Sequence, residues 1–125
     1  MSAPHPLSAR PPVVLSALCP SRDALRHATS TWALLVFYVL REGPHRFSEL
    51  RRRIEGVSER MLAQTLKVLV QDGFVLRTAH AVVPPHVDYE LTALGREMAE
   101  RAGALAEWIE ANTHHIQAAR ARAQR

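Results

Sequence analysis

The chain lacks the features that mark secreted and membrane-embedded proteins. Its 125 residues include one cysteine, Cys19, so no intramolecular disulfide can form, and we expect a reducing, cytoplasmic compartment. The longest apolar run, Trp32 to Leu40, has nine residues, whereas a membrane-spanning helix needs about 20. Arg10 is present near the N-terminus, but no apolar segment of signal-peptide length accompanies it. We therefore expect one soluble domain with a modest core, and no membrane partner.

Signatures of catalysis and metal binding are also missing from the sequence. No Gly-rich phosphate loop occurs, and no nucleophile is paired with a base and an orienting group, so we do not expect an enzyme. The seven histidines include no helical pair spaced four residues apart with a carboxylate. His80 and His86 flank an expected loop, and His114 and His115 are adjacent. The sequence thus predicts neither a metal site nor another cofactor.

Positive charge is concentrated in the middle of the chain. The net charge is +4, of which residues 1–40 carry +2, residues 41–80 carry +3 and residues 81–125 carry −1. The central stretch holds seven arginines and one lysine, which suit contacts with phosphate groups. A charge of this size indicates a nucleic-acid partner without establishing one.

The first 41 residues predict an arm followed by two helices. Residues 1–18 contain four prolines without a sustained hydrophobic period, which is typical of a flexible arm. A short helix is expected to begin at Cys19-Pro20-Ser21, with Ser21 as its N-cap. A second helix is expected over residues 30–41, because Gly43-Pro44 does not continue a helix.

Residues 47–72 predict two helices joined by a tight corner. The first is expected to begin at Phe47, or with Ser48 as its cap, and the second to begin after Ser58. Gly56-Val57 forms the corner between them. In the second helix, over residues 58–72, apolar and polar residues separate onto opposite sides. The apolar stripe comprises Leu62, Leu66 and Leu69, and the polar side comprises Arg60, Gln64, Lys67 and Gln71.

A β-hairpin is expected after Gly73, which ends the second helix. Residues 74–78 and 87–91 are rich in strand-forming residues, and Pro84-Pro85 cannot continue a ladder between them. Helix, corner, helix and hairpin in this order predict a winged helix-turn-helix, a mainly α fold with a small β-hairpin (α+β).

A final helix is expected from Thr92 to about residue 118. Its apolar face is long for a domain of this size, so we expect a second copy of the chain to cover it, as an additional dimerisation helix. Residues 119–125 are expected to be a frayed basic tail, leaving a domain over residues 19–118 with residues 30–92 as its central part. The residues expected at the dimer interface are Leu94, Met98, Leu105, Trp108 and Ile109.

A series of short motifs stands in a specific order between residues 19 and 110. They are Cys19-Pro20, WALL at 32–35, RFSELR at 46–51, SERML at 58–62, Asp72-Gly73 and VPPHVDYELTALG at 83–95. Together they resemble the HxlR family of bacterial transcriptional regulators. The resemblance implies a winged helix-turn-helix homodimer that binds promoter DNA, with its terminal helices at the dimer interface. Two places depart from the family pattern: Ser30-Thr31 replaces a common Gly-Lys, and His80 and Val82 replace an aromatic and an acidic residue.

Three surfaces are expected to face DNA: the outward side of the 58–72 helix, the helix before it and the hairpin, or wing. Arginine and glutamine suit guanine and adenine edges, and the remaining polar groups suit phosphates. The alternative is that these residues form an ordinary solvated surface, with Arg77 paired across the hairpin to Asp88 or Glu90. The expected DNA-binding residues are Ser48, Arg51, Arg52, Ser58, Arg60, Met61, Gln64, Thr65, Lys67, Arg77, His80 and His86.

Two routes of regulation are open at this point. In the resembled family, some members use a cysteine at the place of Cys19 as a sensor of oxidants or electrophiles, and a helix N-terminus favours the reactive thiolate. The alternative for Cys19 is a small buried residue that braces the first helix. Trp32, Phe37 and Tyr38 could line a pocket for a small-molecule effector, although an aromatic stripe on a buried helix is more often core.

The sequence therefore predicts a homodimeric, sequence-specific DNA-binding transcriptional regulator. We expect a repressor or autoregulator rather than an activator, on a near-palindromic operator whose half-sites lie about 34 Å apart. The alternative is a winged-helix module that binds an acidic protein without sequence-specific DNA binding.

Overall fold

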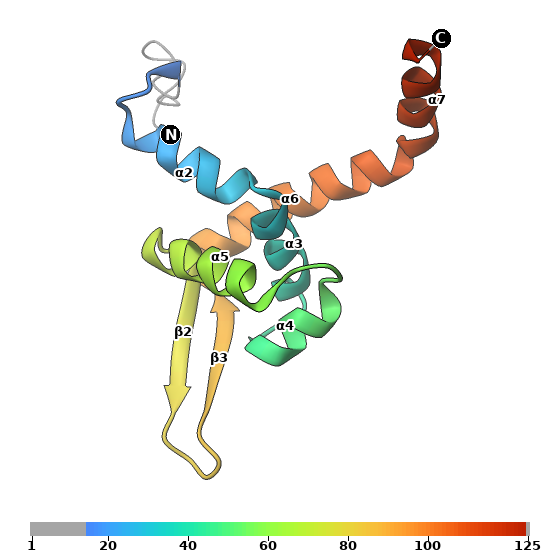
Figure 1. Ribbon diagram of the computed structural model, residues 1–125. Coiled ribbons are helices and arrows are strands. Elements are labelled where there is room, and N and C mark those ends of the chain that lie inside the picture. Colours follow the sequence, from blue (N-terminus) through green and yellow to red (C-terminus); the bar gives the residue numbers. More distant parts are fainter. Residues whose placement is uncertain (1–14, 125) are drawn as a thin grey trace, which may run out of the picture.

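The computed structural model describes residues 15–124, which form a helical domain with one projecting hairpin (Figure 1). The elements follow one another in the order α2 (Pro20–Thr29), α3 (Thr31–Leu40), β1 (His45–Arg46), α4 (Phe47–Arg53), α5 (Glu59–Gln71), β2 (Val75–His80), β3 (His86–Leu91), α6 (Ala93–Ala111) and α7 (Thr113–Ala123). Mainly helical content with a small antiparallel sheet confirms the predicted winged helix-turn-helix. None of the described helices is both long and apolar enough to cross a membrane.

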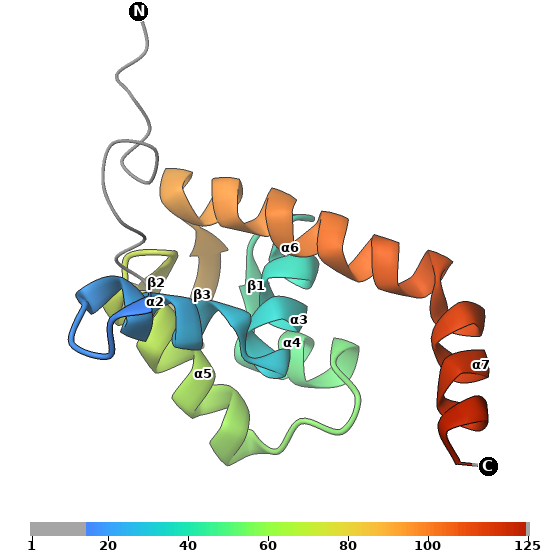
Figure 2. The same cartoon turned by 90° about the horizontal axis from the view of Figure 1, so that it is seen from above.

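Helix α3 lies at the centre of the core. Its residues are apolar on nearly every side, and Val36, Phe37 and Leu40 are buried. The ring of Phe37 meets that of Phe74 edge to face, with the centroids 5.5 Å apart. Helices α2, α4, α5 and α6 each contact α3, so the other helices assemble around it (Figure 2). Leu50 of α4 and the Leu62, Leu66 and Leu69 stripe of α5 fill the space between them.

The sheet joins the hairpin to the segment before α4. Strand β3 lies in the middle, with β2 and β1 antiparallel on either side. The β2–β3 register runs from Val75 opposite Leu91 to His80 opposite His86, and the far end of the hairpin extends well beyond the helices (Figure 1). Strand β1 was not predicted, because His45 and Arg46 form too short a run to give a period-two pattern. Pairing with β3 alone defines it.

Helix α6 begins directly beside the start of the hairpin. Thr92 caps it: its Oγ1 accepts a hydrogen bond from the Gly95 amide at 3.0 Å and donates one to the Gly73 carbonyl at 2.6 Å. The Thr92 amide also donates to the Phe74 carbonyl at 3.0 Å. These bonds connect the end of β3, the start of β2 and the first turn of α6, and so fix the base of the wing against the core.

At two helix starts the sequence suggested a serine cap that is not present: one of these starts was wrong, and the other had a second prediction that is confirmed. Helix α2 is preceded by Cys19 as N-cap, with Pro20 in its first turn, rather than by Ser21. Helix α4 begins at Phe47, the first of its two predicted starts, so Ser48 is not a cap but lies inside the helix. Its first turn is held by a bond from the Arg46 amide to Glu49 Oε1 at 2.7 Å.

The C-terminal helix is two helices, not one that runs to residue 118 and then frays. It breaks at Asn112, whose Nδ2 donates to the Trp108 carbonyl at 2.9 Å, and α7 continues to Ala123 at a sharp angle to α6 (Figures 1 and 2). An asparagine side chain that bonds back to its own helix competes with the backbone ladder, which explains the break. The N-terminal arm expected over residues 1–18 falls largely outside the described residues, which begin at Leu15.

Candidate DNA-binding surface

Helix α5 presents a polar side to solvent because its apolar stripe is fixed in the core. Leu62, Leu66 and Leu69 are at most 2% exposed, whereas Arg60, Gln64 and Lys67 are exposed, as the helical spacing predicts. Met61 is also exposed on the first turn. Ser58 caps the helix through a bond from the Met61 amide to its Oγ at 3.0 Å, which helps to hold this first turn. The side of α5 that faces solvent thus offers two long cations and an amide.

Thr65 does not belong to this surface, so the prediction that it contacts DNA was wrong. It is 7% exposed, and its Oγ1 donates to the Met61 carbonyl at 2.8 Å. Position 65 follows the buried Leu62 by three residues, which places it on the same side of the helix. Its polar character suggested the outward side, but the helical period decides its place.

The wing and α5 together form a groove of about 280 Å³. Lys67, Val70 and Gln71 of α5 line it together with Arg77 of β2 and Tyr89 of β3. A shallow depression on the adjoining part of α5 shares Ala63 and Lys67 with this groove and is also lined by Arg60 and Gln64. Cationic side chains from the helix and from the wing therefore border one continuous concave surface. Spacing along the chain gave no indication that Arg77 and Lys67 would meet.

Helix α4 carries three consecutive arginines, Arg51, Arg52 and Arg53, in its last turn. Ser48, Arg51 and Arg52 are exposed. Arg53 makes two hydrogen bonds of 2.7 Å to the carboxylate of Glu42. These bonds hold the pKa of Glu42 below its ordinary value and raise that of Arg53. Arg53 is therefore engaged within the protein, and Arg51 and Arg52 remain the α4 candidates for a phosphate contact.

The predicted wing residues divide between the two faces of the hairpin. Arg77 is exposed and stands opposite Tyr89 in the register, not opposite Asp88 or Glu90. Because side chains alternate along a strand, His80 and His86 lie on the other face. There, His80 Nε2 lies 2.8 Å from Asp88 Oδ2, and His86 Nε2 lies 3.8 Å from the same oxygen. Helical spacing does not predict this cluster, because strand register is what brings these residues together.

Helix α6 and the region of α2 expose apolar side chains. On α6, Leu94, Leu105, Trp108 and Ile109 are between 44% and 61% exposed, as expected for residues that a partner would cover. Met98 is less exposed than these residues, because it packs against the core of its own chain. Leu18 and Leu25, which sequence reasoning did not single out, are also exposed, at 94% and 46%. Leu18 precedes α2 and Leu25 lies within it.

Cys19 is half-buried at the N-terminus of α2. Its Sγ lies 3.1 Å from the hydroxyl of Ser21. Further along α2, His27 Nδ1 lies 2.7 Å from Asp72 Oδ2, and Asp72 is the C-cap of α5. The helix that begins at the cysteine is thus directly attached to the end of the helix that presents Arg60 and Gln64.

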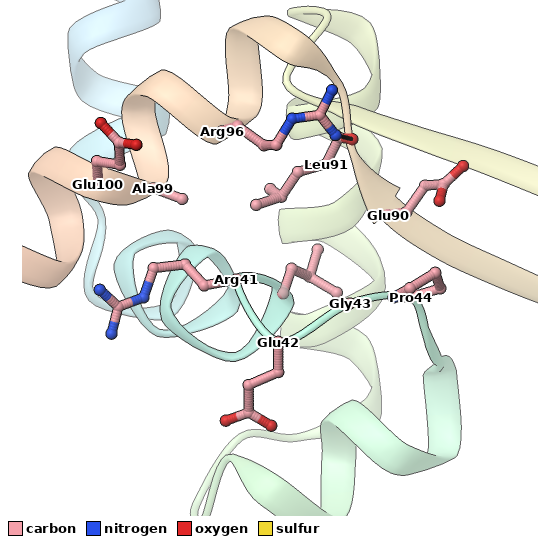
Figure 3. A pocket seen from close by; sticks show the side chains of 10 residues that line it. Arg41, Glu42, Gly43, Pro44, Glu90, Leu91, Arg96, Ala99 and Glu100 are labelled. Carbon is pink, nitrogen blue, oxygen red and sulfur yellow. Dashed lines mark hydrogen bonds between the residues drawn. The ribbon is translucent and has the colours of Figure 1, made fainter.

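Two of the three aromatic residues on α3 follow the core interpretation that the sequence favoured over an effector pocket. Phe37 is completely buried, and Trp32 packs against the core. A pocket of about 400 Å³ instead lies between the segment after α3 and the start of α6 (Figure 3). Two arginines and three glutamates line it, so its charge does not favour one class of ligand. These residues are Arg41, Glu42, Glu90, Arg96 and Glu100.

Comparison with known proteins agrees with this geometry. Residues 28–117 match the HxlR-like helix-turn-helix family. The chain is 58% identical over 102 residues to the uncharacterized HTH-type transcriptional regulator YtfH of Escherichia coli K12, which covers 82% of this chain and 81% of that protein. It also resembles the structure of YtfH from Salmonella typhimurium, with a TM-score of 0.81 and 51% identity over 86% of this chain and 96% of that one. The oxidized form of the redox regulator HypR has a TM-score of 0.69 and 36% identity, covering 75% and 97%. The chain belongs to the HxlR family of winged helix-turn-helix, DNA-binding transcriptional regulators.

Proposed function

We propose that the protein is a homodimeric repressor that reads a near-palindromic operator with α5. The observation that carries this proposal is the exposure of Arg60, Gln64 and Lys67 on one side of a helix whose other side is fixed in the core. The major groove of B-DNA is about 12 Å wide and admits one α-helix. Arg60 and Gln64 would address guanine and adenine edges, and Met61 would add an apolar contact.

Phosphate contacts would surround this helix. Lys67 and Arg77 line one groove and would meet the backbone beside the major groove, while Ser48, Arg51 and Arg52 would meet it at the other side. Ser58 would position a phosphate near the start of α5. The wing would follow the backbone into the adjacent minor groove, and His80 and His86 would stand near its tip.

The exposed apolar side of α6 supports dimerisation. A second copy would cover Leu105, Trp108 and Ile109, and would relate two α5 helices by a twofold axis. Two such helices would enter successive major grooves about 34 Å apart.

A binding assay with variants tests the reading side. DNA upstream of the gene and an unrelated fragment of equal length are titrated with the wild type, Arg60→Ala and Gln64→Ala, and fluorescence anisotropy reports affinity. We expect each variant to lose preference for the specific fragment by about tenfold, since a bidentate base contact contributes about 1–3 kcal/mol. Arg120→Ala and Gln117→Ala are matched controls, because both residues are exposed on α7 and lie outside α4, α5, α6 and the wing.

The outcomes of that assay separate the candidate functions. Unchanged preference in both α5 variants would refute the assigned reading side. Salt-sensitive DNA binding without any preference in the wild type would instead favour a module that binds an acidic protein partner.

Cys19 is our candidate for the sensing residue. It caps α2, which is attached through His27 and Asp72 to the end of α5, and the similar protein HypR is a redox regulator by name. Modification of the thiol by an electrophile or oxidant would disturb the first turn of α2 and, through it, α5. The test compares operator affinity of the wild type and Cys19→Ser, with and without a quinone or a peroxide. A response confined to the wild type is expected, and equal responses would remove Cys19 as the sensor.

A further inference from the structure

Three side chains with metal-binding atoms gather near the far end of the wing. His80 closes β2 and His86 opens β3, and the two residues are register partners. Asp88 follows His86 by two positions, so its side chain lies on the same face of the hairpin. One ligand atom from each residue lies within 4.8 Å of the others.

The distances between these atoms fit a small divalent cation. Bonds of about 2.0–2.1 Å in a tetrahedral site place two ligand atoms about 3.3 Å apart. His80 Nε2 is 2.8 Å from Asp88 Oδ2 and His86 Nε2 is 3.8 Å from it, so the required separation lies between the two. The two imidazole rings are stacked, with their centroids 4.5 Å apart. Because the rings are stacked, side-chain rotation would be needed to direct both ring nitrogens and the carboxylate at one ion.

The surroundings permit an ion to enter and keep water ligands. The side chains of His80, His86 and Asp88 are 38%, 24% and 29% exposed. Two imidazoles and one carboxylate suit zinc and other first-row transition metals rather than calcium or magnesium, which prefer oxygen ligands alone. We propose that the wing binds one divalent transition-metal ion, of the zinc type, through His80, His86 and Asp88.

An ion at this place would alter the wing in two ways. It would tie the end of β2 to the start of β3 and so constrain residues 81–85 between them. It would also add two positive charges where the chain supplies one carboxylate. The second consequence makes the metal a regulator of DNA affinity if the proposed function holds, whereas metal binding itself does not depend on that function.

The test measures metal binding to the full chain without an affinity tag and without DNA. Zn²⁺ is titrated by calorimetry, and Co²⁺ by its visible absorption, whose intensity reports the coordination number of the bound ion. We expect one ion per chain, and a loss of affinity of at least about tenfold in each of His80→Gln, His86→Gln and Asp88→Asn.

The matched control is the double variant His114→Gln with His115→Gln. These residues also form a close ring pair, with centroids 3.9 Å apart, but they lie on exposed α7 and outside the three-residue cluster. The double variant should bind Zn²⁺ with the same affinity and stoichiometry as the wild type. Circular dichroism checks that each variant is folded, and the ¹⁵N shifts of the histidine rings in the wild type, recorded with and without Zn²⁺, identify the ligands without any substitution.

Two results would overturn the proposal. One is no saturable binding by the wild type at Zn²⁺ concentrations of about 100 µM. The other is binding that His80→Gln and Asp88→Asn leave unchanged or that shifts only the His114 and His115 rings. In either case, the contact between His80 and Asp88 does not hold a metal ion. Because no DNA is present, failure here leaves the operator proposal intact, and failure of the operator proposal leaves this one intact.

Discussion

Gly95 lies so close to the carbonyl group of Phe74 that a side chain at position 95 would overlap with the carbonyl oxygen. The contact joins the first turn of α6 to the start of β2, where the Thr92 amide also donates to the same carbonyl. A glycine is therefore required for α6 to approach the base of the wing. Strand β2 follows α5 directly along the chain. The contact between Gly95 and Phe74, at the start of β2, therefore helps to fix the wing relative to α5.

Gly95→Ala should destabilise the protein, because the main-chain carbonyl of Phe74 cannot move aside without disturbing β2. We expect a cost of about 1–3 kcal/mol, and a fall in Tm of about 5 °C or more at fixed protein concentration. Gly103→Ala is the matched control in the same helix. The three atoms nearest to a methyl group there belong to the guanidinium of Arg41, the far end of a flexible side chain, and the gain in helix propensity of about 1 kcal/mol offsets its displacement. Equal losses in both variants would contradict this explanation.

The Glu42–Arg53 pair should make stability depend on pH in the acid range. The hydrogen bonds from Arg53 lower the pKa of Glu42 in the folded protein relative to its ordinary value of 4.5. The pair's contribution to the free energy of unfolding is therefore present above pH 4.5, and it is lost as pH falls through the lowered pKa of Glu42 in the folded protein. We expect Glu42→Gln to flatten the dependence of Tm on pH between about pH 5 and about pH 3. Both groups are exposed, so the effect is small. Glu55→Gln, at another exposed glutamate, is the comparison, and an equal flattening there would refute the assignment.

Thr65→Val should leave operator recognition unchanged. The side chain is buried, and its hydroxyl bonds only to the Met61 carbonyl within the same helix. Valine has nearly the same shape, so we expect operator affinity within about twofold of the wild type and a stability change within about 1 kcal/mol. Gln64→Ala, one residue away on the exposed side, should change the preferred sequence in the same assay. A changed preference in Thr65→Val would show that Thr65 reaches DNA after all.

The sequence predicted an element well where residues close together in the chain determine its start, its buried face and its end. The 58–72 helix was predicted within one residue of α5, because Ser58, a stripe of leucines and Gly73 mark its start, its face and its end within a short stretch. Gly73 adopts a φ of +82°, as a residue after a helix often does.

Features that depend on distant contacts were not predictable in the same way. Strand β1 exists only through its pairing with β3, and the His80–His86–Asp88 cluster exists only in one hairpin register. The break at Asn112 was missed because the apolar period of α6 continues up to Ile109 and the residues beyond it favour helix. For the same reason, the groove that joins Lys67 to Arg77 required the packing of α5 on the sheet to be known.

Trp108→Ala should weaken the proposed dimer. Trp108 is 61% exposed on α6, between Leu105 and Ile109, and a large exposed aromatic side chain is the kind of residue that dominates an interface. We expect the dimer dissociation constant to rise about 30-fold or more, as for loss of about 2 kcal/mol, when it is measured by sedimentation velocity over a dilution series. Leu76→Ala is the control, because Leu76 is a similarly exposed apolar residue, at 48%, that belongs to β2 and not to α6. A wild type that sediments as a monomer at about 10 µM, or a dimer equally sensitive to both substitutions, would show that α6 is not the interface.

Because the operator proposal needs two α5 helices related by this contact, Trp108→Ala should also reduce affinity for a two-half-site operator far more than for a single half-site.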